Sequence, residues 1–316
     1  QEVTSTGIFG NVGYNVNDQL RIAGGLRFSN DEKDAGADIA FGLFPRNRDW
    51  DEVSWDLSAS YEMDNGISVY GAIQSGYQSG QFNPRPYCFD DWPDCFVAGD
   101  NVTAINYELG LKGQPLERLQ MSAAIFLTNY SDLPYQVSQL DPAGGFATYN
   151  LIVDQTSIGF EWESTAYVTD NFLLHETLGY IDVDVDEQLV DVVGEQQTVK
   201  PVAPLTPELT FSISPELRIP TNGGGQWVLR ADYSYRDDMW GEPSSDPARM
   251  SKIESRDIVN FDFSYRSADE SWLAGVYGRN ATDERYRNAI LNLSDYILEI
   301  LSNDASEFGL RFQKSF

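Results

Sequence analysis

Apolar and polar residues alternate with a period of two through most of this 316-residue chain. From Val53 to Met63 every second residue is apolar or aromatic, and the residues between them are Ser, Asp or Glu. The segments Trp227–Arg236 and Ile258–Arg266 alternate in the same way. Successive side chains of a β-strand point to opposite faces, so each segment predicts a strand with one apolar and one polar face.

This alternation predicts thirteen strands. Most run for 10–13 residues, beyond the usual length of about 5–6 in soluble sheets and enough for the roughly 9–11 residues of a tilted membrane-crossing strand. The strands are expected near 4–15, 19–30, 51–63, 67–79, 101–113, 117–131, 146–169, 172–186, 206–219, 225–237, 256–267, 271–283 and 305–316.

The connections between these strands alternate strictly between short and long. The short ones are turns rich in Asn, Asp and Gly, such as Asp64-Asn65-Gly66, and one of them is expected at Gly113–Leu116. The long ones lie near 31–50, 80–100, 132–145, 187–205, 238–255 and 284–304. In an up-and-down sheet this places every turn at one end and every long loop at the other, which is typical of outer-membrane barrels. The sequence therefore predicts an all-β fold, an antiparallel transmembrane β-barrel.

Composition argues against several classes of function. The chain has 49 acidic and 21 basic residues, a net charge of −28, which disfavours a nucleic-acid-binding surface. One His and two Cys leave too few ligands for zinc and little His-based catalysis, and no nucleophile–base pair is evident. The longest apolar run is Ala123–Leu127, far short of the about 20 residues of a spanning helix. We therefore expect no enzyme activity, no metal centre and no cofactor.

Six segments, in order along the chain, carry a resemblance to a known family. They are LRIAGGLRFSNDEKD (20–34), YGAIQSGYQSGQFN (70–83), NYELGLK (106–112), NYSDL (129–133), GFEWE (159–163) and GRNATDERY (278–286). The final strand alternates up to a terminal Phe316. Together these features resemble the barrel half of the TonB-dependent outer-membrane receptors.

The resemblance implies a 22-stranded barrel closed by an N-terminal plug domain. The thirteen predicted strands would then be the last ones, and residues 1–316 would be the C-terminal portion of the barrel, with the plug and the first strands outside this sequence. An open sheet in lipid leaves two edges of unsatisfied backbone groups, each costing several kcal/mol. We therefore expect the sequence to be part of a longer polypeptide.

The resemblance also implies a function. Receptors of this family lie in the outer membrane of Gram-negative bacteria, bind a scarce nutrient at the extracellular face and import it with energy supplied through TonB. A ferric siderophore is the expected nutrient class. Expected partners are the TonB complex, acting through the plug, the nutrient, and outer-membrane lipid and lipopolysaccharide. The alternative is a passive pore, or a structural or adhesion barrel without a plug.

The end of the fourth predicted strand and the loop after it carry the candidate site residues. Tyr77, Gln78, Gln81, Phe82, Asn83 and Arg85 are the expected ligand contacts, with a simple wet lumen wall as the competing interpretation. Cys88 and Cys95 are expected to form a disulfide on the oxidising outer surface. Asp90, Asp91 and Asp94 could hold Ca²⁺, although a solvated acidic loop is the simpler interpretation.

Ten charged residues fall in the polar register of the predicted strands. We expect them to line the lumen and to pair across strands or with the plug, because buried charges are usually paired. They are Arg21, Arg27, Glu108, Lys112, Glu161, Glu163, Arg230, Asp232, Asp262 and Arg279.

Overall fold

The computed structural model describes residues 2–39, 42–82, 98–140, 146–192, 195–244, 251–293, 296–302 and 305–315. Throughout these ranges the chain forms strands, turns and loops, without a helix. The described residues accordingly contain no long apolar helix of the kind that crosses a membrane.

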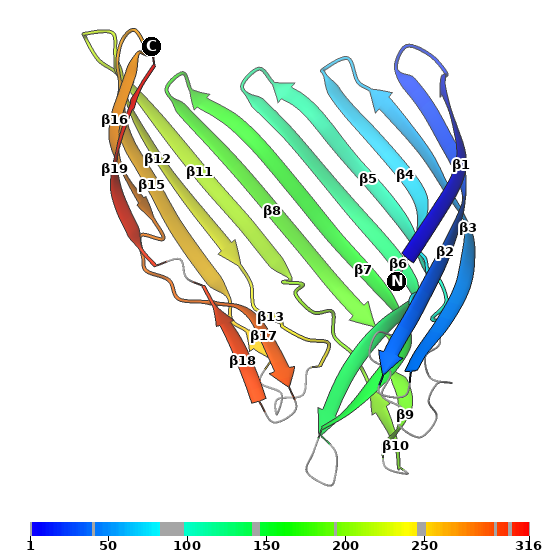
Figure 1. Cartoon of the computed structure of the whole chain (residues 1–316). Helices are drawn as coiled ribbons and strands as arrows, with labels where there is room; N and C mark the ends of the chain where they lie inside the picture. Colours follow the sequence, from blue (N-terminus) through cyan, green and yellow to red (C-terminus); the bar gives the residue numbers. More distant parts are fainter. Residues whose placement is uncertain are drawn as a thin grey trace.

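A single antiparallel sheet of thirteen strands forms the body of the structure, and it confirms the predicted number and order (Figure 1). Each strand pairs with the sheet strands before and after it in the chain. The strands are β1 (Glu2–Asn15), β2 (Leu20–Ile39), β3 (Gly42–Glu62), β4 (Ile67–Gln78), β5 (Val102–Leu116), β6 (Leu119–Leu140), β7 (Phe146–Thr169), β8 (Phe172–Val185), β11 (Leu209–Pro220), β12 (Gln226–Arg236), β15 (Arg256–Arg266), β16 (Trp272–Arg279) and β19 (Glu307–Lys314).

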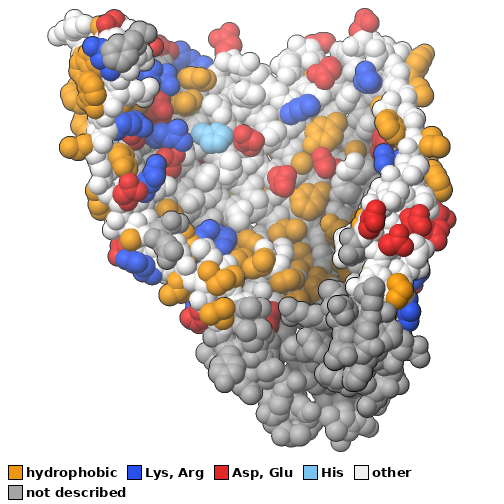
Figure 2. Space-filling model, in the orientation of Figure 1, with side chains coloured by type: hydrophobic (Ala, Val, Ile, Leu, Met, Phe, Trp, Pro, Cys, Tyr) orange, Lys and Arg blue, Asp and Glu red, His pale blue; other side chains and the backbone are white. Residues whose placement is uncertain are grey.

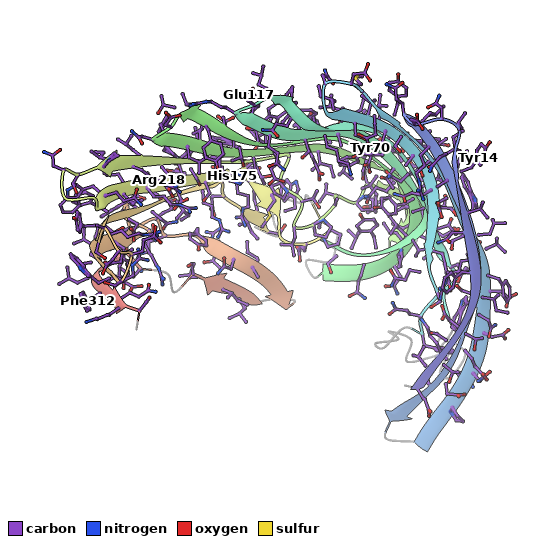
Figure 3. The ribbon with its side chains drawn as sticks, turned by 90° about the horizontal axis from the view of Figure 1, so that it is seen from above. Tyr14, Tyr70, Glu117, His175, Arg218 and Phe312 are labelled. Carbon is purple, nitrogen blue, oxygen red and sulfur yellow. The ribbon has the colours of Figure 1, made fainter. Side chains whose placement is uncertain are left out.

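The sheet curls into an open trough and does not close. β1 and β19 are its two edges, and no ladder joins them within the described residues. Seen from above, the trough has one convex and one concave side and a wide gap between its ends (Figure 3). Thirteen strands with this curvature therefore do not make a barrel by themselves, as we expected from the sequence.

The two ends of the trough differ as predicted, with tight turns at the top of Figure 1 and long arms at the bottom. Two of the predicted long loops are wrong, however. The β2–β3 ladder continues to Ile39 and Gly42, and the β6–β7 ladder continues to Leu140 and Phe146. These connections are extended hairpins, because a continued ladder satisfies backbone groups that a loop would leave to water. Three small hairpins fill other long connections: β9 (Gln188–Val192) with β10 (Glu195–Val199), β13 (Met239–Trp240) with β14 (Lys252–Ile253), and β17 (Arg287–Leu293) with β18 (Tyr296–Leu301).

The turn expected at Gly113–Leu116 is also misplaced. β5 continues through these residues to Leu116, and the two turn residues are Glu117 and Arg118. The β5–β6 register shifts between Gly113 and Leu116, which marks an irregularity in the ladder. Gly113 has a φ of +149°, and a Cβ there would lie 2.3 Å from the Gly66 carbonyl oxygen. The glycine that indicated a turn instead allows this irregular pairing.

The two faces of the sheet differ in chemistry. Large apolar side chains stand out from the convex face, where Leu57, Ile125 and Ile158 are each more than half exposed. Tyr14 and Phe312 lie on this side, whereas Tyr70 and His175 lie on the concave side (Figure 3). Charged side chains are spread over the hollowed face (Figure 2). An apolar surface of this extent needs an apolar environment around it.

Buried apolar clusters occur at the long-arm end rather than in the body of the sheet. The largest joins the arms of β6, β7 and β8 to β10, and Leu151 in it is fully buried. Its members are Val137, Leu151, Val153, Val185 and Val199, with Tyr135, Val183 and Val190 packed against them. The arms therefore carry their own small core, beyond the body of the sheet.

Asp269 stabilises the tight turn between β15 and β16 through hydrogen bonds. Its Oδ1 accepts hydrogen bonds from the Ser267 hydroxyl at 2.6 Å and from the Ser271 backbone N–H at 3.2 Å. Hydrogen bonding by Ser267 and then by Ser271 lowers the pKa of Asp269 to about 2. A carboxyl with a depressed folded-state pKa stabilises the fold above its unfolded value of 3.8, and this contribution is lost as the pH falls through about 2.

We therefore expect Asp269→Asn to lower the thermal unfolding temperature in detergent at pH 7. The difference from the wild type should shrink as the pH approaches 2, where the wild-type carboxylate becomes protonated. Melting curves of both proteins across this range check the expectation. An equal difference at every pH would contradict it.

Candidate functional site

A cluster of basic and aromatic side chains lies where β4 ends and packs against the long arms of β2 and β3. We call it the clasp and define it as Lys33, Arg48, Trp50 and Phe82 with the backbone of Gly80 and Gly99. Lys33 comes from β2, Arg48 and Trp50 come from β3, and the other members come from the segments that leave β4 and return to β5. The clasp therefore fixes where the connection after β4 begins and ends.

Lys33 holds the first half of this connection. Its Nζ donates to the Gly80 carbonyl at 2.8 Å and to the Ser79 carbonyl at 3.2 Å. The ammonium also lies 5.2 Å from the centre of the Trp50 ring, within the range of a cation–π contact. Lys33 is only 7% exposed, so these contacts replace most of the water around its charge.

Trp50 and Arg48 hold the second half. The Trp50 indole N–H donates to the Gly99 carbonyl at 3.0 Å, and Phe82 packs edge-on against the ring at 6.1 Å. Arg48 donates to the Ala98 carbonyl at 2.9 Å and forms an ion pair with Asp100 at 2.5 Å. Its guanidinium also lies 5.2 Å from the Trp50 ring centre, so Trp50 has contacts with two cations.

Gly80 is required by the close approach of the two halves. A Cβ at this position would lie 2.0 Å from the Gly99 carbonyl oxygen and 2.5 Å from Trp50 Nε1. No side chain fits there while the Trp50–Gly99 hydrogen bond exists. Beside it, Asn101 Nδ2 donates to the Asp51 carbonyl at 3.0 Å and to Glu52 at 3.1 Å. The Asn101 Oδ1 atom is buried and accepts no hydrogen bond from the described residues.

The predicted ligand contacts fall around this clasp. The Tyr77 hydroxyl donates to Asp31 Oδ2 at 2.9 Å, and Gln78 and Gln81 are exposed. Phe82 is 6% exposed, so its ring is packed against Trp50 rather than open to a ligand. The other predicted residues lie outside the described part of the chain: Asn83, Arg85, Cys88, Asp90, Asp91, Asp94 and Cys95.

The predicted lumen charges are only partly paired. Arg230 is paired with Asp232 at 2.8 Å, Asp262 with Arg311 at 2.7 Å, and Arg279 with Glu307 at 3.7 Å. Glu108 instead accepts a hydrogen bond from the Tyr70 hydroxyl at 2.7 Å.

Other carboxylates border a hollow on the concave face. This hollow, of about 350 Å³, is lined by Tyr70, Glu108, Lys112, Glu161 and Glu163 among others. Among the described residues Glu161 and Glu163 have no cationic partner, so their charge faces the space inside the trough.

The described residues hold no group of three or more His, Cys, Asp or Glu that could bind a metal ion. Lys33, Arg48 and Trp50 were not predicted from the sequence, because their partners lie about 50 positions away along the chain. One signal could have found them. Trp50 shares the strand phase of Glu52, Ser54 and Asp56, so it is a large aromatic residue in the polar register.

Comparison with known protein families finds a match over most of the chain. The model of the family described as TonB dependent receptor-like, beta-barrel, matches residues 1–281. Two pesticin receptors are similar to part of the chain. The one from Yersinia pestis is 31% identical over 142 residues, which is 42% of this chain and 20% of that protein. The one from Yersinia enterocolitica is 32% identical over 126 residues, which is 38% of this chain and 18% of that protein.

Solved structures share the fold over nearly the whole chain. The ferric yersiniabactin uptake receptor FyuA from Yersinia pestis has a TM-score of 0.76 at 18% identity and covers 99% of this chain and 46% of its own. The siderophore receptor PiuA from Acinetobacter baumannii has a TM-score of 0.73 at 16% identity, and the match covers 98% of this chain and 42% of PiuA. The copper transporter OprC has a TM-score of 0.72 at 13% identity, and the match covers 99% of this chain and 48% of OprC. The chain thus spans less than half the length of the proteins it matches.

Proposed function

This chain belongs to the TonB-dependent receptor family, in its β-barrel part, and we propose that it forms the C-terminal portion of an outer-membrane receptor that imports a scarce nutrient. The rest of the barrel and a plug domain would come from further polypeptide, and TonB would supply the energy through the plug. The family is an outer-membrane family of Gram-negative bacteria and is not enzymatic.

The observation that carries the proposal is the open thirteen-stranded trough with an apolar convex face, a charged concave face and arms at one end only. Lipid gives the convex side chains an apolar environment, but it cannot satisfy the backbone groups at the edges of β1 and β19. Further strands between these edges would satisfy them and would enclose the charged face around a lumen. The unpaired Glu161 and Glu163 would then face either water or a plug.

We propose a ferric siderophore as the nutrient class. Two of the structural neighbours are a ferric yersiniabactin uptake receptor and a siderophore receptor, which supports this class. The ligand would enter between the arms and meet the vestibule next to the clasp, where Gln78 and Gln81 are exposed. Tyr77, Gln78, Gln81, Asn83 and Arg85 are the residues that we propose as its contacts. Phe82 would act by holding Trp50 rather than by touching the ligand. The convex face and the outer arms would contact lipid and lipopolysaccharide.

Energy-dependent accumulation of iron tests this function. Cells that lack their own receptors and produce the full-length protein would be given a panel of ⁵⁵Fe-loaded siderophores, with and without a working TonB. We expect one siderophore to be accumulated only when TonB is present. Accumulation of none of them, or equal accumulation in both strains, would contradict the proposal.

A passive pore remains the rival function, and electrical conductance separates the two. The full-length protein would be placed in a planar lipid bilayer under an applied voltage. A barrel filled by a plug should carry no steady ion current, whereas an open pore with this charged concave face should conduct continuously. A persistent cation-selective current would favour the passive pore.

A further inference from the structure

Two arginines face each other across neighbouring strands on the concave side. Arg236 ends β12 and is paired with Arg256, the first residue of β15. Both fall in the register of Arg230 and Asp262, the polar register of these strands, so they point to the lumen side. They lie at the long-arm end of the trough, because β12 and β15 are joined there by the connection that carries β13 and β14 (Figure 1).

Neither arginine has a carboxylate partner among the described residues. The Nε and Nη2 atoms of Arg236 are buried and donate no hydrogen bond. Arg256 places its guanidinium carbon 4.0 Å from the centre of the Tyr286 ring and donates only a long bond of 3.4 Å to Asn288 Oδ1. Its contacts are with an aromatic ring and a neutral amide, so its charge is also left without a counter-ion.

The carboxylates closest in the chain either lie in the other strand register or have partners of their own. Asp257, next to Arg256, is opposite Tyr235 and therefore points to the other face of the sheet. Asp238 is paired with Lys252 at 3.0 Å, and Glu254 is paired with Arg287 at 3.0 Å. Asp237 accepts a hydrogen bond from Tyr235 at 3.2 Å. A chain with 49 acidic residues and a net charge of −28 has many carboxylates that could have been placed here. None of those within the described residues forms an ion pair with Arg236 or Arg256.

This arrangement is unfavourable while the site is empty. Like charges directly opposite each other on neighbouring strands are destabilising, and the two buried Arg236 nitrogens that lack a hydrogen-bond acceptor cost free energy. One oxyanion between the two side chains removes both penalties. Guanidinium groups present paired N–H donors that match the two oxygens of a carboxylate or phosphate.

We propose that Arg236 and Arg256 bind an oxyanionic group, of the carboxylate or phosphate type, on the imported nutrient. The proposal rests on the function proposed above and names the chemistry by which this site recognises its ligand. Lipopolysaccharide phosphates contact the convex side of a barrel, whereas this pair faces the lumen.

Binding of small anions to the purified full-length protein in detergent tests the site without TonB. Citrate would be the carboxylate probe and inorganic phosphate the second probe, each titrated calorimetrically at a fixed chloride concentration. We expect saturable binding of at least one of them. Arg236→Gln should weaken that binding about tenfold or more, because one charge-assisted hydrogen-bonding group is lost. Arg279→Gln is the matched control, since Arg279 also ends a strand at the long-arm end, and it should leave binding unchanged.

Arg256→Glu separates anion binding from a structural role. The new carboxylate would lie opposite Arg236 and occupy the place of the anion, so citrate and phosphate binding should disappear while the unfolding temperature stays the same or rises. No binding of either probe to the wild type would overturn the proposal, as would full binding by Arg236→Gln or Arg256→Glu. Uptake that depends on TonB, with no anion binding, would refute this site and leave the proposed function standing.

Discussion

Trp50→Ala should make the chain cleavable by trypsin after Lys33 or Arg48 about a hundredfold faster than the wild type. Trp50 is 4% exposed and contacts Phe82, both cations and the Gly99 carbonyl. Truncating a buried tryptophan costs about 3–5 kcal/mol. When a protease cuts a transiently opened form, each 1.4 kcal/mol changes the rate about tenfold, so about 3 kcal/mol gives roughly a hundredfold. Timed digestion of intact cells followed by peptide mass spectrometry measures the rate.

Trp55→Ala is the matched control, because it makes the same truncation on the same strand. Trp55 is 38% exposed and lies in the apolar register of the convex face, away from the clasp. Its cleavage rate at Lys33 and Arg48 should remain close to that of the wild type. Equal rates for both variants would contradict the role given to the clasp.

Asn280→Ala should lower the temperature at which the protein unfolds in detergent by several degrees. Asn280 is 3% exposed, its Nδ2 donates to the Glu284 carbonyl at 2.9 Å and its Oδ1 accepts from the Glu284 N–H at 2.8 Å. Its φ is +43°, a region that costs most side chains about 1–2 kcal/mol and that Asn tolerates. Two lost hydrogen bonds of about 1 kcal/mol each and this strain together remove about 3 kcal/mol. The shift of the folded band on unheated gels, followed over temperature, measures it.

Asn280→Gly separates the two contributions. Glycine adopts a positive φ without strain, so this variant loses the hydrogen bonds alone and should unfold between the wild type and Asn280→Ala. An Asn280→Ala protein that unfolds at the wild-type temperature would show that the hydrogen bonds of this side chain do not stabilise the GRNATDERY segment.

Strand positions could be predicted from the sequence because each strand is apolar on one face only. The alternation from Val53 to Met63 fixes the orientation of β3 and the end of it that meets the turn, and the Asn- and Gly-containing turn at 64–66 fixes its pairing with β4. The use of glycine as a turn signal failed at Gly113, because glycine occurs both in turns and in irregular ladders. The alternation missed the outer arms, where the ladder continues through sequences such as Asp31–Asp38 that lack a clear apolar face.

The site was less accessible to sequence reasoning. Tyr77 and Gln78 could be placed at the end of a recognisable strand, and Gln81 in the segment after it, but their role as ligand contacts stays a prediction. The clasp joins Lys33 to Gly80 and Trp50 to Gly99, and no local pattern reports contacts over such separations. Arg236 and Arg256 became a pair only when the β12–β15 register was known. Each residue by itself looks like an ordinary solvated charge.

The mass of the natural polypeptide tests the central claim most directly, namely that this sheet is the C-terminal part of a larger closed receptor. The protein that contains this sequence would be isolated from the outer-membrane fraction, denatured and weighed intact by mass spectrometry. The sequence accounts for 35.4 kDa and covers 46% of the FyuA chain, so we expect a mass about twice as large. A mass near 35.4 kDa would contradict the claim, because thirteen strands would then have to close by themselves or with a partner chain.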